Sequence, residues 1–497
     1  MNVNSFLKNS DTRIAIIFLF VSVVFIFFRL GAPHLADWDE ALYAGIAGDM
    51  VRQGDLITLT LQGTPWFEKE PLPFWLMAAA LRLFGFYEYA VRLPAAFFSI
   101  FLAPLMYLCA RYWFNKPLAA LAALFFFFSP PLWDAHALRT GNFDTMALSL
   151  FLFSFVLYVR VRMYRFWWVV GIPLALGFLT RGVMGLLPLL LIVTAEFLRR
   201  VWMKEEKNWS FQRMVFFISG VCFPWFLWHL FLWTRFGSDY VAVYWKEQFF
   251  GRIAGPLQGH VGSADFYLTY WLDNIGVFFL ILAFSAIFLV YRFVSTHDYK
   301  QAILIIWLLL TMAPIHIMET KLSWYALPVL PALWLSAAFF TQQVYLQFIV
   351  RVSEQKRTLY RIIVIILALC LFLILLFWMR GLTRGLSLLE THAFRHPLST
   401  VAAAFPTDAP VVIYRVGGWN YGRLLPSWYW YIRFVYDWQP FLINTQNIEY
   451  YAARPAAFPF WLTDEQGFEA LQNTLGSEYA EIIQTSDYLY LVKNKMP

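Results

Sequence analysis

Long apolar runs constrain this chain more than any other feature of its sequence. Ile14–Phe28 and Ile362–Met379 contain no charged residue and approach the roughly 20 apolar residues that cross the hydrocarbon core of a bilayer. Of the 497 residues, 60% are hydrophobic and only 14% are charged, against about a quarter in soluble domains. This composition excludes an ordinary water-soluble enzyme and a disordered chain. Because no alternating segments of about ten residues are visible, the sequence predicts an all-α polytopic membrane domain rather than a transmembrane barrel.

The apolar runs predict about eleven membrane-spanning helices, and the charges between them predict the topology. The expected spans are 14–31, 89–110, 117–133, 142–159, 167–180, 182–198, 214–235, 267–291, 301–318, 322–345 and 360–379. The segment 71–86 is short and contains Arg82, so we expect a juxtamembrane or re-entrant helix there. Most Lys and Arg residues of the short loops then lie on one side, which the positive-inside rule makes the cytoplasm. The N-terminus is therefore cytoplasmic, in an uncleaved first helix.

Residues 385–497 differ in character from the preceding part. Their apolar runs are shorter, and 410–416 and 486–494 are typical of strands bounded by turn residues, whereas 465–475 is typical of a helix. We therefore predict two domains, a membrane domain at 1–384 and a small C-terminal α/β periplasmic domain at 385–497.

Neither the cysteines nor the net charge indicates a further partner. Cys109, Cys222 and Cys370 all lie in apolar runs, as small buried side chains do, and not in the patterns of disulfides or metal ligands. The net charge of +7 arises mostly in the loops assigned to the cytoplasm, so it reflects topology and not a nucleic-acid surface.

The sequence also lacks the nucleotide motifs GxxxxGK[ST] and GxGxxG, zinc-type Cys/His spacing and the GxSxG elbow. Any reaction must therefore use a substrate that was activated beforehand.

Acidic residues gather directly after the first predicted span. In 36–50, apolar residues recur at helical spacing, so this stretch is expected to form an amphipathic helix on the outer membrane surface. Asp39 and Glu40 stand at its start, where the helix dipole favours carboxylates. Helix capping is the plain interpretation of such a pair. We favour a functional role, because the pair begins a surface helix immediately after a span.

A second charged stretch, Glu68-Lys69-Glu70, precedes a proline and an aromatic-rich segment. Its plain interpretation is an interfacial anchor, with Trp66 and Trp75 in the aromatic belt. A cation between two carboxylates is more than an anchor needs. It suits a site that holds both a phosphate and a proton acceptor.

Further charged residues lie at the predicted outer ends of later spans. They are Arg139, Asp144, Arg181, Arg252, His260 and Lys321. Each alone is weak evidence, because a lysine at a helix end often only snorkels toward water. An arginine at the membrane edge, however, is costly without an anionic partner. The cations among them, Arg139, Arg181, Arg252 and Lys321, together with Lys69 favour an anionic, lipid-linked substrate. The outer-face catalytic loops are then expected at 31–88, 134–145 and 236–266.

Five stretches then follow one another in the order of a known family's motifs. They are DEALYAGIAGDM (39–50), WFEKEPLPFWL (66–76), VRLPAAFFS (91–99), FLTRGVMGLLP (178–188) and KLSWYALPVLPAL (321–333). With them, residues 30–335 resemble the bacterial members of the dolichyl-phosphate-mannose–protein mannosyltransferase family, which include the aminoarabinose–lipid A transferases and have the GT-C fold. Glu70 stands where the family usually has proline, and Arg181 replaces a lysine. The second change keeps the charge but not the geometry, since guanidinium binds phosphate as a fork.

The resemblance implies a hexosyl or pentosyl transferase in the bacterial inner membrane. It would move a sugar from a polyprenyl-phosphate carrier, such as undecaprenyl phosphate, to an acceptor on the outer face, with inversion. Asp39 matches the family's catalytic aspartate and Glu68 is the second expected catalytic residue. The expected substrate-binding residues are Glu40, Tyr43, Lys69, Arg139, Asp144, Arg181, Arg252, His260, Lys321 and Tyr325.

The sugar, the acceptor and any cofactor stay open at this point. The acceptor is lipid A, another glycan or a protein, and the remaining expected partners are membrane lipids. No cofactor is firmly indicated; for a divalent metal, the weak candidate ligands are Glu70 and His260.

Three alternatives remain. A transporter of lipid-linked sugars should carry its charges near the bilayer midplane, within repeats, and neither feature is visible. A polymerase or ligase for lipid-linked oligosaccharides gives no reason for the Asp39–Glu40 pair. A structural membrane protein with an interaction domain at 385–497 leaves the outer carboxylates unexplained.

Overall fold

A computed structural model describes residues 10–134, 136–160, 167–203, 211–256, 260–348, 398–401, 410–414, 418–419, 423–443, 448–454, 457–476, 480–486 and 489–495. Within these ranges, six helices are long and apolar enough to cross a membrane: Ser10–Phe27, Glu88–Ala110, Gln212–Ala254, Phe278–Thr296, Tyr299–Ile317 and Ser323–Leu346. The prediction of a multi-pass helical membrane protein is confirmed. The expected span at 360–379 lies outside the described residues, and the total of eleven spans stays a prediction.

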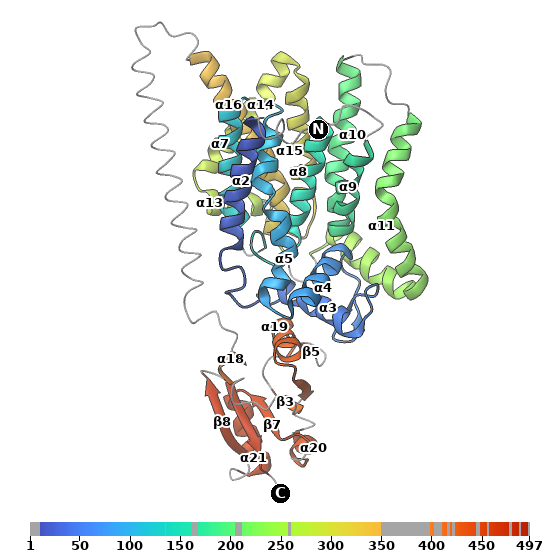
Figure 1. Cartoon of the computed structure of the whole chain (residues 1–497), viewed down its shortest axis with the longest axis vertical. Coiled ribbons are helices and arrows are strands. Elements are labelled where there is room, and N and C mark those ends of the chain that lie inside the picture. Colours follow the sequence, from blue (N-terminus) through green and yellow to red (C-terminus); the bar gives the residue numbers. More distant parts are fainter. Residues whose placement is uncertain are drawn as a thin grey trace. The chain divides into compact units, whose positions relative to one another are not determined.

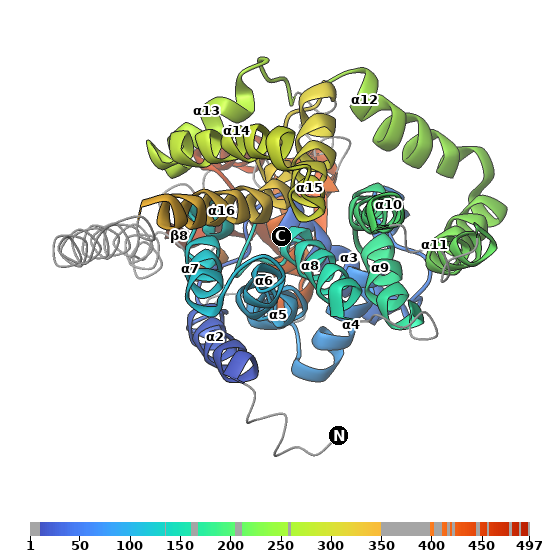
Figure 2. The same cartoon turned by 90° about the horizontal axis from the view of Figure 1, so that it is seen from above.

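The chain divides into two compact units, and the first contains residues 1–28, 67–73 and 95–386. Its described elements are α2 (Ser10–Phe27), α6 (Leu102–Ala110), α7 (Lys116–Phe127), η1 (Pro130–Trp133), α8 (Asp144–Arg160), α9 (Trp167–Arg181), η3 (Gly182–Gly185), α10 (Leu186–Met203), α11 (Phe211–Tyr240), η4 (Val241–Gly251), α12 (Arg252–Ala254), α13 (Phe266–Ile275), α14 (Phe278–Thr296), α15 (Tyr299–Ile317), η6 (Ser323–Val329) and α16 (Leu330–Phe348). Figure 1 shows α8, α9 and α10 side by side, and Figure 2 shows α14 lying along α16.

Small residues and local caps explain how this bundle packs. Helix α7 begins at an asparagine cap, because the Asn115 side chain accepts a hydrogen bond from the Leu118 N–H. Ala119, Ala122 and Ala123 of this helix are all buried, and the helix packs against α6 and α16. Small side chains let helix backbones approach closely where lipid offers no hydrophobic driving force.

Two predicted spans are interrupted at a glycine with a positive φ. The run 267–291 contains two helices, because Gly276 takes a φ of 65° between α13 and α14. The helix expected at 214–235 extends to Tyr240 through a kink at Gly237, where φ is 54°, and continues into η4. A positive φ is readily available to glycine and breaks the regular helix in both places. Apolarity alone did not reveal these breaks.

The second compact unit contains residues 29–66, 74–94 and 387–497. Its elements are α3 (Asp39–Gln53), β1 (Thr60–Leu61), β2 (Thr64–Pro65), most of α4 (Leu72–Phe84), the first part of α5 (Glu88–Ser99), α18 (Leu398–Val401), β3 (Pro410–Tyr414), β4 (Gly418–Trp419), β5 (Arg423–Leu424), α19 (Pro426–Trp430), η11 (Tyr431–Val435), β6 (Gln439–Ile443), α20 (Ile448–Ala452), β7 (Phe460–Thr463), α21 (Glu465–Leu475), β8 (Ala480–Ser486) and β9 (Leu489–Asn494). The unit thus joins most of the loop that follows α2 to the C-terminal tail. The predicted division at 384/385 lies outside the described residues.

A mixed five-stranded sheet confirms the small C-terminal α/β domain. Its strand order is β6-β3-β7-β9-β8, with β3 parallel to β6 and β7, and β9 antiparallel to β7 and β8. Val412, Trp461, Leu471 and Val492 form part of its core. The predicted strands at 410–416 and 486–494 correspond to β3 and β9. The predicted helix at 465–475 is α21, which begins where Asp464 accepts a hydrogen bond from the Gly467 N–H.

Helix α3 is covered on more than one side. The predicted helix at 36–50 is confirmed, but every residue from 43 to 50 is buried, which corrects the expectation of a half-exposed surface helix. The glycines of α3 make this possible, because a Cβ at Gly45 would lie 3.1 Å from Tyr429, and one at Gly48 would lie 2.6 Å from Phe434. Close approach of α19 and η11 to α3 therefore leaves no room for a Cβ at Gly48 and little room for one at Gly45.

The segment 71–86 forms α4, a helix of 13 residues. Such a helix is about 20 Å long, shorter than the roughly 30 Å hydrocarbon core. This length is expected of a helix that does not cross.

Candidate functional site

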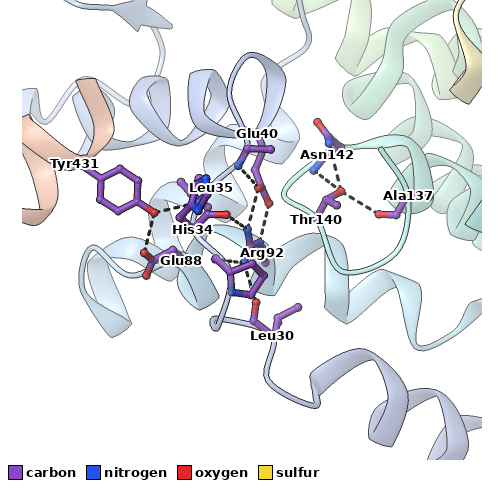
Figure 3. Close-up of polar contacts among 12 residues, drawn as sticks. Leu30, His34, Leu35, Glu40, Glu88, Arg92, Ala137, Thr140, Asn142 and Tyr431 are labelled. Atoms are coloured by element: carbon purple, nitrogen blue, oxygen red, sulfur yellow. Dashed lines mark hydrogen bonds and ion pairs between the residues drawn. The ribbon is translucent and has the colours of Figure 1, made fainter. Parts of the chain in front are cut away.

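Arg92, which our sequence reasoning did not select, organises the loop that precedes α3. Its Nε donates to Glu40 Oε1 at 2.7 Å, and its Nη2 donates to Glu40 Oε2 at 2.9 Å and to the His34 carbonyl at 3.0 Å. Its Nη1 donates to the carbonyls of Leu30 and Pro33 at 3.0 and 2.8 Å. Figure 3 shows these contacts. Guanidinium has five N–H donors, so the protein satisfies all of them.

Asp39 is the first residue of α3 and is half-buried. The residue before it, Trp38, has a φ of 69°, which is uncommon for a bulky side chain. Its neighbour Glu40 is buried, pairs with Arg92 and also accepts a hydrogen bond from the Ala36 N–H at 2.9 Å. The Glu40 carboxylate therefore holds the local fold. The catalytic role of Asp39 and the substrate-binding role of Glu40 stay predictions.

Two further polar residues of α3 are buried. Tyr43 packs edge-on against Trp66 and Phe74. Asp49 accepts a hydrogen bond of 2.5 Å from the Tyr429 hydroxyl. Burial raises the pKa of Asp49, and the Tyr429 hydrogen bond opposes this shift in part.

In the first unit, Glu70 is buried and its Oε1 accepts a hydrogen bond of 2.5 Å from the Tyr244 hydroxyl. Burial raises its pKa, while that hydrogen bond and the charges of Lys69 and Arg181 oppose the shift. A Cβ at Gly182 would collide with Glu70 Oε1, so only glycine fits there, with a φ of 48°. Glu68 and Lys69 precede Glu70 in a bend and are half-buried.

Arg181 and Asp144 form an ion pair on neighbouring helices, although they lie 37 positions apart in the sequence. Both side chains line a pocket whose other walls are largely apolar and include Phe151, Met184 and Trp324. The prediction that an arginine at this helix end needs an anionic partner is met by Asp144.

Arg252 and Lys321 form a second cationic group of the first unit. The buried Arg252 donates from Nε and Nη2 to Gln248 Oε1 at 3.0 and 2.7 Å, and from Nη1 to the Tyr325 hydroxyl at 3.2 Å. The buried Lys321 donates from Nζ to the carbonyls of Ile315 and His316 at 3.0 and 2.9 Å.

Backbone contacts tie this group together. Val261 and Thr320 pair as an antiparallel bridge, and the Lys321 N–H donates to the His260 carbonyl at 3.2 Å. His260 itself is exposed. Four predicted substrate-binding residues, Arg252, His260, Lys321 and Tyr325, therefore lie together although 73 positions separate the first from the last.

Two remaining predictions concern Arg139 and a metal. Arg139 has a φ of 68° and donates from Nη2 to the Phe28 carbonyl at 2.7 Å. In the described part of the chain, no three His, Cys, Asp or Glu side chains gather as ligands for a metal ion. Metal binding through Glu70 and His260 stays a prediction.

The structure thus groups the predicted residues by unit. The second unit holds Asp39, Glu40 and Tyr43, and the first holds the others. Arg92, Tyr244 and Tyr431 are the contacts our sequence reasoning missed. Arg92 alone had a sequence signal, since it lies in the VRLPAAFFS stretch and near the outer end of a span.

The chain is similar in sequence to a known family and to several curated proteins. Residues 68–228 match the family described as dolichyl-phosphate-mannose-protein mannosyltransferase. The undecaprenyl phosphate-alpha-4-amino-4-deoxy-L-arabinose arabinosyl transferase of Pseudomonas savastanoi is 28% identical over 306 residues, which are 59% of this chain and 54% of that protein. Its namesake in Pseudomonas aeruginosa (strain LESB58) is 27% identical over 303 residues, 59% of this chain and 53% of that protein. The chain therefore spans about half the length of the curated relatives it matches.

Solved structures share the fold over almost the whole chain. ArnT from Cupriavidus metallidurans, bound to undecaprenyl phosphate, aligns with a TM-score of 0.67 at 19% sequence identity. The alignment covers 97% of this chain and 98% of the ArnT chain. The oligosaccharyltransferase of Archaeoglobus fulgidus in its apo form aligns with a TM-score of 0.51 at 14% identity, over 97% of this chain and 74% of its own. The expected GT-C fold is confirmed.

Proposed function

We propose that this chain, which matches the dolichyl-phosphate-mannose-protein mannosyltransferase family over residues 68–228 and shares the fold of the solved ArnT structure, is an integral membrane glycosyltransferase. It takes a sugar from a polyprenyl-phosphate donor and transfers it, with inversion, to an acceptor on the outer face of a bacterial inner membrane. The N-terminus is cytoplasmic and the C-terminal domain is periplasmic in this proposal. A lipid such as lipid A is the acceptor class we favour, since the curated relatives are arabinosyl transferases that use an undecaprenyl phosphate sugar.

One observation carries the proposal: Arg252 and Lys321 are buried cations with neutral partners. Among the described residues, their hydrogen bonds go only to an amide, a phenol and two backbone carbonyls. No carboxylate of the described part forms an ion pair with either side chain. A buried charge is costly unless it is paired, so an anion is the expected occupant. The phosphate of a lipid-linked sugar supplies that charge at the membrane surface.

The proposed sugar transfer is a single displacement at the anomeric carbon. The acceptor hydroxyl oxygen attacks the anomeric carbon, and the bond from that carbon to the phosphate oxygen breaks with its electron pair going to the phosphate. Arg252 and Lys321 stabilise the charge that develops on the leaving phosphate. The acceptor proton passes to a carboxylate acting as general base, the role that the family resemblance implies for Asp39. No nucleotide is required, because the donor is already activated.

Mass spectrometry of envelope lipids and proteins, with and without the chain, tests the proposal in cells. We expect one glycan-modified species to disappear when the chain is absent. An unchanged set of lipids and proteins would contradict glycosyl transfer.

Binding of undecaprenyl phosphate to the full chain in nanodiscs tests the phosphate site directly. Loss of charge-assisted hydrogen bonds in Arg252→Met should weaken binding by about 10-fold or more. Arg454→Met is the matched control, since Arg454 is exposed and lies over the Tyr450 ring. Equal affinity in Arg252→Met and the wild type would remove Arg252 from the site.

A further inference from the structure

One short segment of the C-terminal tail contacts the outer loop at successive points. We define residues 424–437 as the clamp segment. Its contacts, in chain order, are Leu424 N and O with the Gln62 side chain (3.1 and 2.8 Å), Ser427 N with Asp37 Oδ1 (3.0 Å), the Tyr429 hydroxyl with Asp49 Oδ1 (2.5 Å), the Tyr431 hydroxyl with Glu88 Oε1 and Leu35 N (2.9 and 3.0 Å), and Asp437 Oδ1 with Arg52 Nη2 (2.8 Å). All of these partners lie in the second unit, before and after Asp39 in the sequence.

Two of these contacts reach the residues immediately before Asp39. The Leu35 N–H donates to the Tyr431 hydroxyl, and the Asp37 carboxylate accepts from the Ser427 N–H. Between these residues and Asp39 stands Trp38, with its φ of 69°. Such a conformation persists only where the surrounding structure holds the backbone in place. The clamp segment supplies that restraint from one side.

Arg92 supplies the restraint from the other side. It holds Glu40, the residue after Asp39, and it lies one helical turn after Glu88 on α5. Tyr431 binds Glu88 and Leu35, so one face of α5 is linked through Tyr431 to the backbone before Asp39 and through Arg92 to the Glu40 carboxylate after it (Figure 3). Tyr431 is the only described side chain of this network that joins Leu35 to Glu88.

We propose that the clamp segment sets the position of the reactive carboxylate, and that Tyr431 is a positioning residue for Asp39. The inference rests on the proposed function, because it requires Asp39 to act in transfer. The tail is then part of the catalytic machinery without touching the donor. Its contribution is to the geometry of the acceptor side and not to recognition of the lipid phosphate.

Tyr431→Phe in the full chain tests this, because it deletes the hydroxyl that binds Leu35 and Glu88. We expect faster hydrogen–deuterium exchange in the peptide that covers residues 30–42. We also expect sugar transfer to fall about 10- to 100-fold, the scale of a small misplacement of reacting groups. The Kd for undecaprenyl phosphate should stay unchanged. Tyr490→Phe is the matched control, since Tyr490 stacks on Phe468 in the C-terminal sheet domain and contacts none of the clamp partners.

A double-mutant cycle separates positioning from general stability. In an Asp39→Asn background, Tyr431→Phe should cost almost nothing further, because no carboxylate remains to be positioned. Additive losses would overturn the inference, and so would a Tyr431→Phe protein that transfers sugar at the wild-type rate. If Tyr431→Phe does not fold, Asp37→Ala decides instead. This substitution removes the carboxylate that accepts the hydrogen bond from the Ser427 N–H, and the Asp37 side chain is exposed. Normal transfer in that variant would equally overturn the inference.

The same variants distinguish the two proposals. If Asp39→Asn transfers sugar normally, the proposed catalytic role of Asp39 fails and the positioning role fails with it. If Asp39→Asn is inactive while Tyr431→Phe and Asp37→Ala are normal, only the positioning inference fails.

Discussion

Two buried arginines show how partners decide the role of a charge. All five N–H groups of Arg92 bind a carboxylate or backbone carbonyls of its own chain, which leaves none for a ligand. The hydrogen bonds of Arg252 go to the neutral groups of Gln248 and Tyr325. At the level of residues, therefore, Arg92 builds the loop before α3, and Arg252 is suited to hold an anion.

Removal of Arg92 should destabilise the protein strongly. Arg92→Met leaves Glu40 buried without its cation, which typically costs about 3–5 kcal/mol. Thermal unfolding of the full chain in detergent measures the effect. In the double variant Arg92→Met/Glu40→Gln, part of the lost stability should be regained, because this pair then leaves no buried charge. A double variant no more stable than Arg92→Met would show that the hydrogen bonds to carbonyls dominate.

Asp49 should make stability depend on pH. Burial raises the pKa of this carboxyl in the folded protein, so the folded state binds a proton more readily than the unfolded state. The stability that this group contributes is present below its ordinary pKa and decreases as pH rises through the raised pKa. Asp49→Asn, which keeps an acceptor for Tyr429, should therefore raise the Tm at pH 8 more than at pH 4.

The control for this prediction is Asp464→Asn, because asparagine caps a helix about as well as aspartate. Its Tm should follow the wild type at both pH values. The same Tm difference at pH 4 and pH 8 in Asp49→Asn would show that the carboxyl does not titrate over this range.

The sequence predicted the type of most residues in the candidate site but not their partners. Charge and position selected Asp39, Glu40, Arg181 and Arg252. Helical spacing and the positive-inside rule carry no information on which residues pair across 37 or 52 positions, as Arg181 with Asp144 and Arg92 with Glu40 do. Those pairs depend on how helices pack, which the local pattern leaves undetermined.

At the level of elements, helix type was predictable and helix interruption was not. The apolar runs located α2, α8, α9 and α15 within a few residues, and α21 was predicted separately in the C-terminal tail. The breaks at Gly237 and Gly276 depend on a single backbone angle each, and glycine occurs in helices without such breaks. The covering of α3 by α19 and η11 also lay beyond local sequence, because these elements are separated by nearly 380 residues.

Gly48 tests the packing of α3 against η11. A Cβ at this position would lie 2.6 Å from Phe434, so Gly48→Ala should destabilise the fold by about 1–3 kcal/mol. Gly220→Ala in α11 is the matched control, since no atom lies within 4 Å of its Cβ and alanine favours a helix. Thermal unfolding compares the two. Equal Tm values for both variants would mean that Phe434 moves aside without cost.

At the level of the whole molecule, the prediction of a polytopic membrane protein followed directly from length and composition, and the six long apolar helices confirm it. The eleven spans, predicted from the apolar runs, and the orientation, predicted from the charges of the loops, stay predictions. They depend on the segments between spans, of which the structure describes only part.

Reporter fusions test the orientation. Fusions after residues 60, 140, 260 and 400 should lie outside, and fusions after 113, 163, 205 and 355 should lie in the cytoplasm, because the loops rich in Lys and Arg stay inside. Reporter activity on each side of the membrane is the measurement. An external reporter at 163 would overturn the eleven-span topology and separate Asp39 from Asp144.

The hydroxyl of Tyr431 also has a consequence for biosynthesis. A ribosome completes Leu35 and Glu88 long before it adds residue 431, so the hydrogen bonds that this hydroxyl forms with both arise only near the end of translation. All the predicted spans precede residue 431, so the loop around Asp39 completes these hydrogen bonds only after the spans have been synthesised. A nascent chain that stops before residue 431 would therefore carry Asp39, the proposed general base, in a loop that lacks this restraint, and under the proposed function we expect premature release to yield an inactive protein.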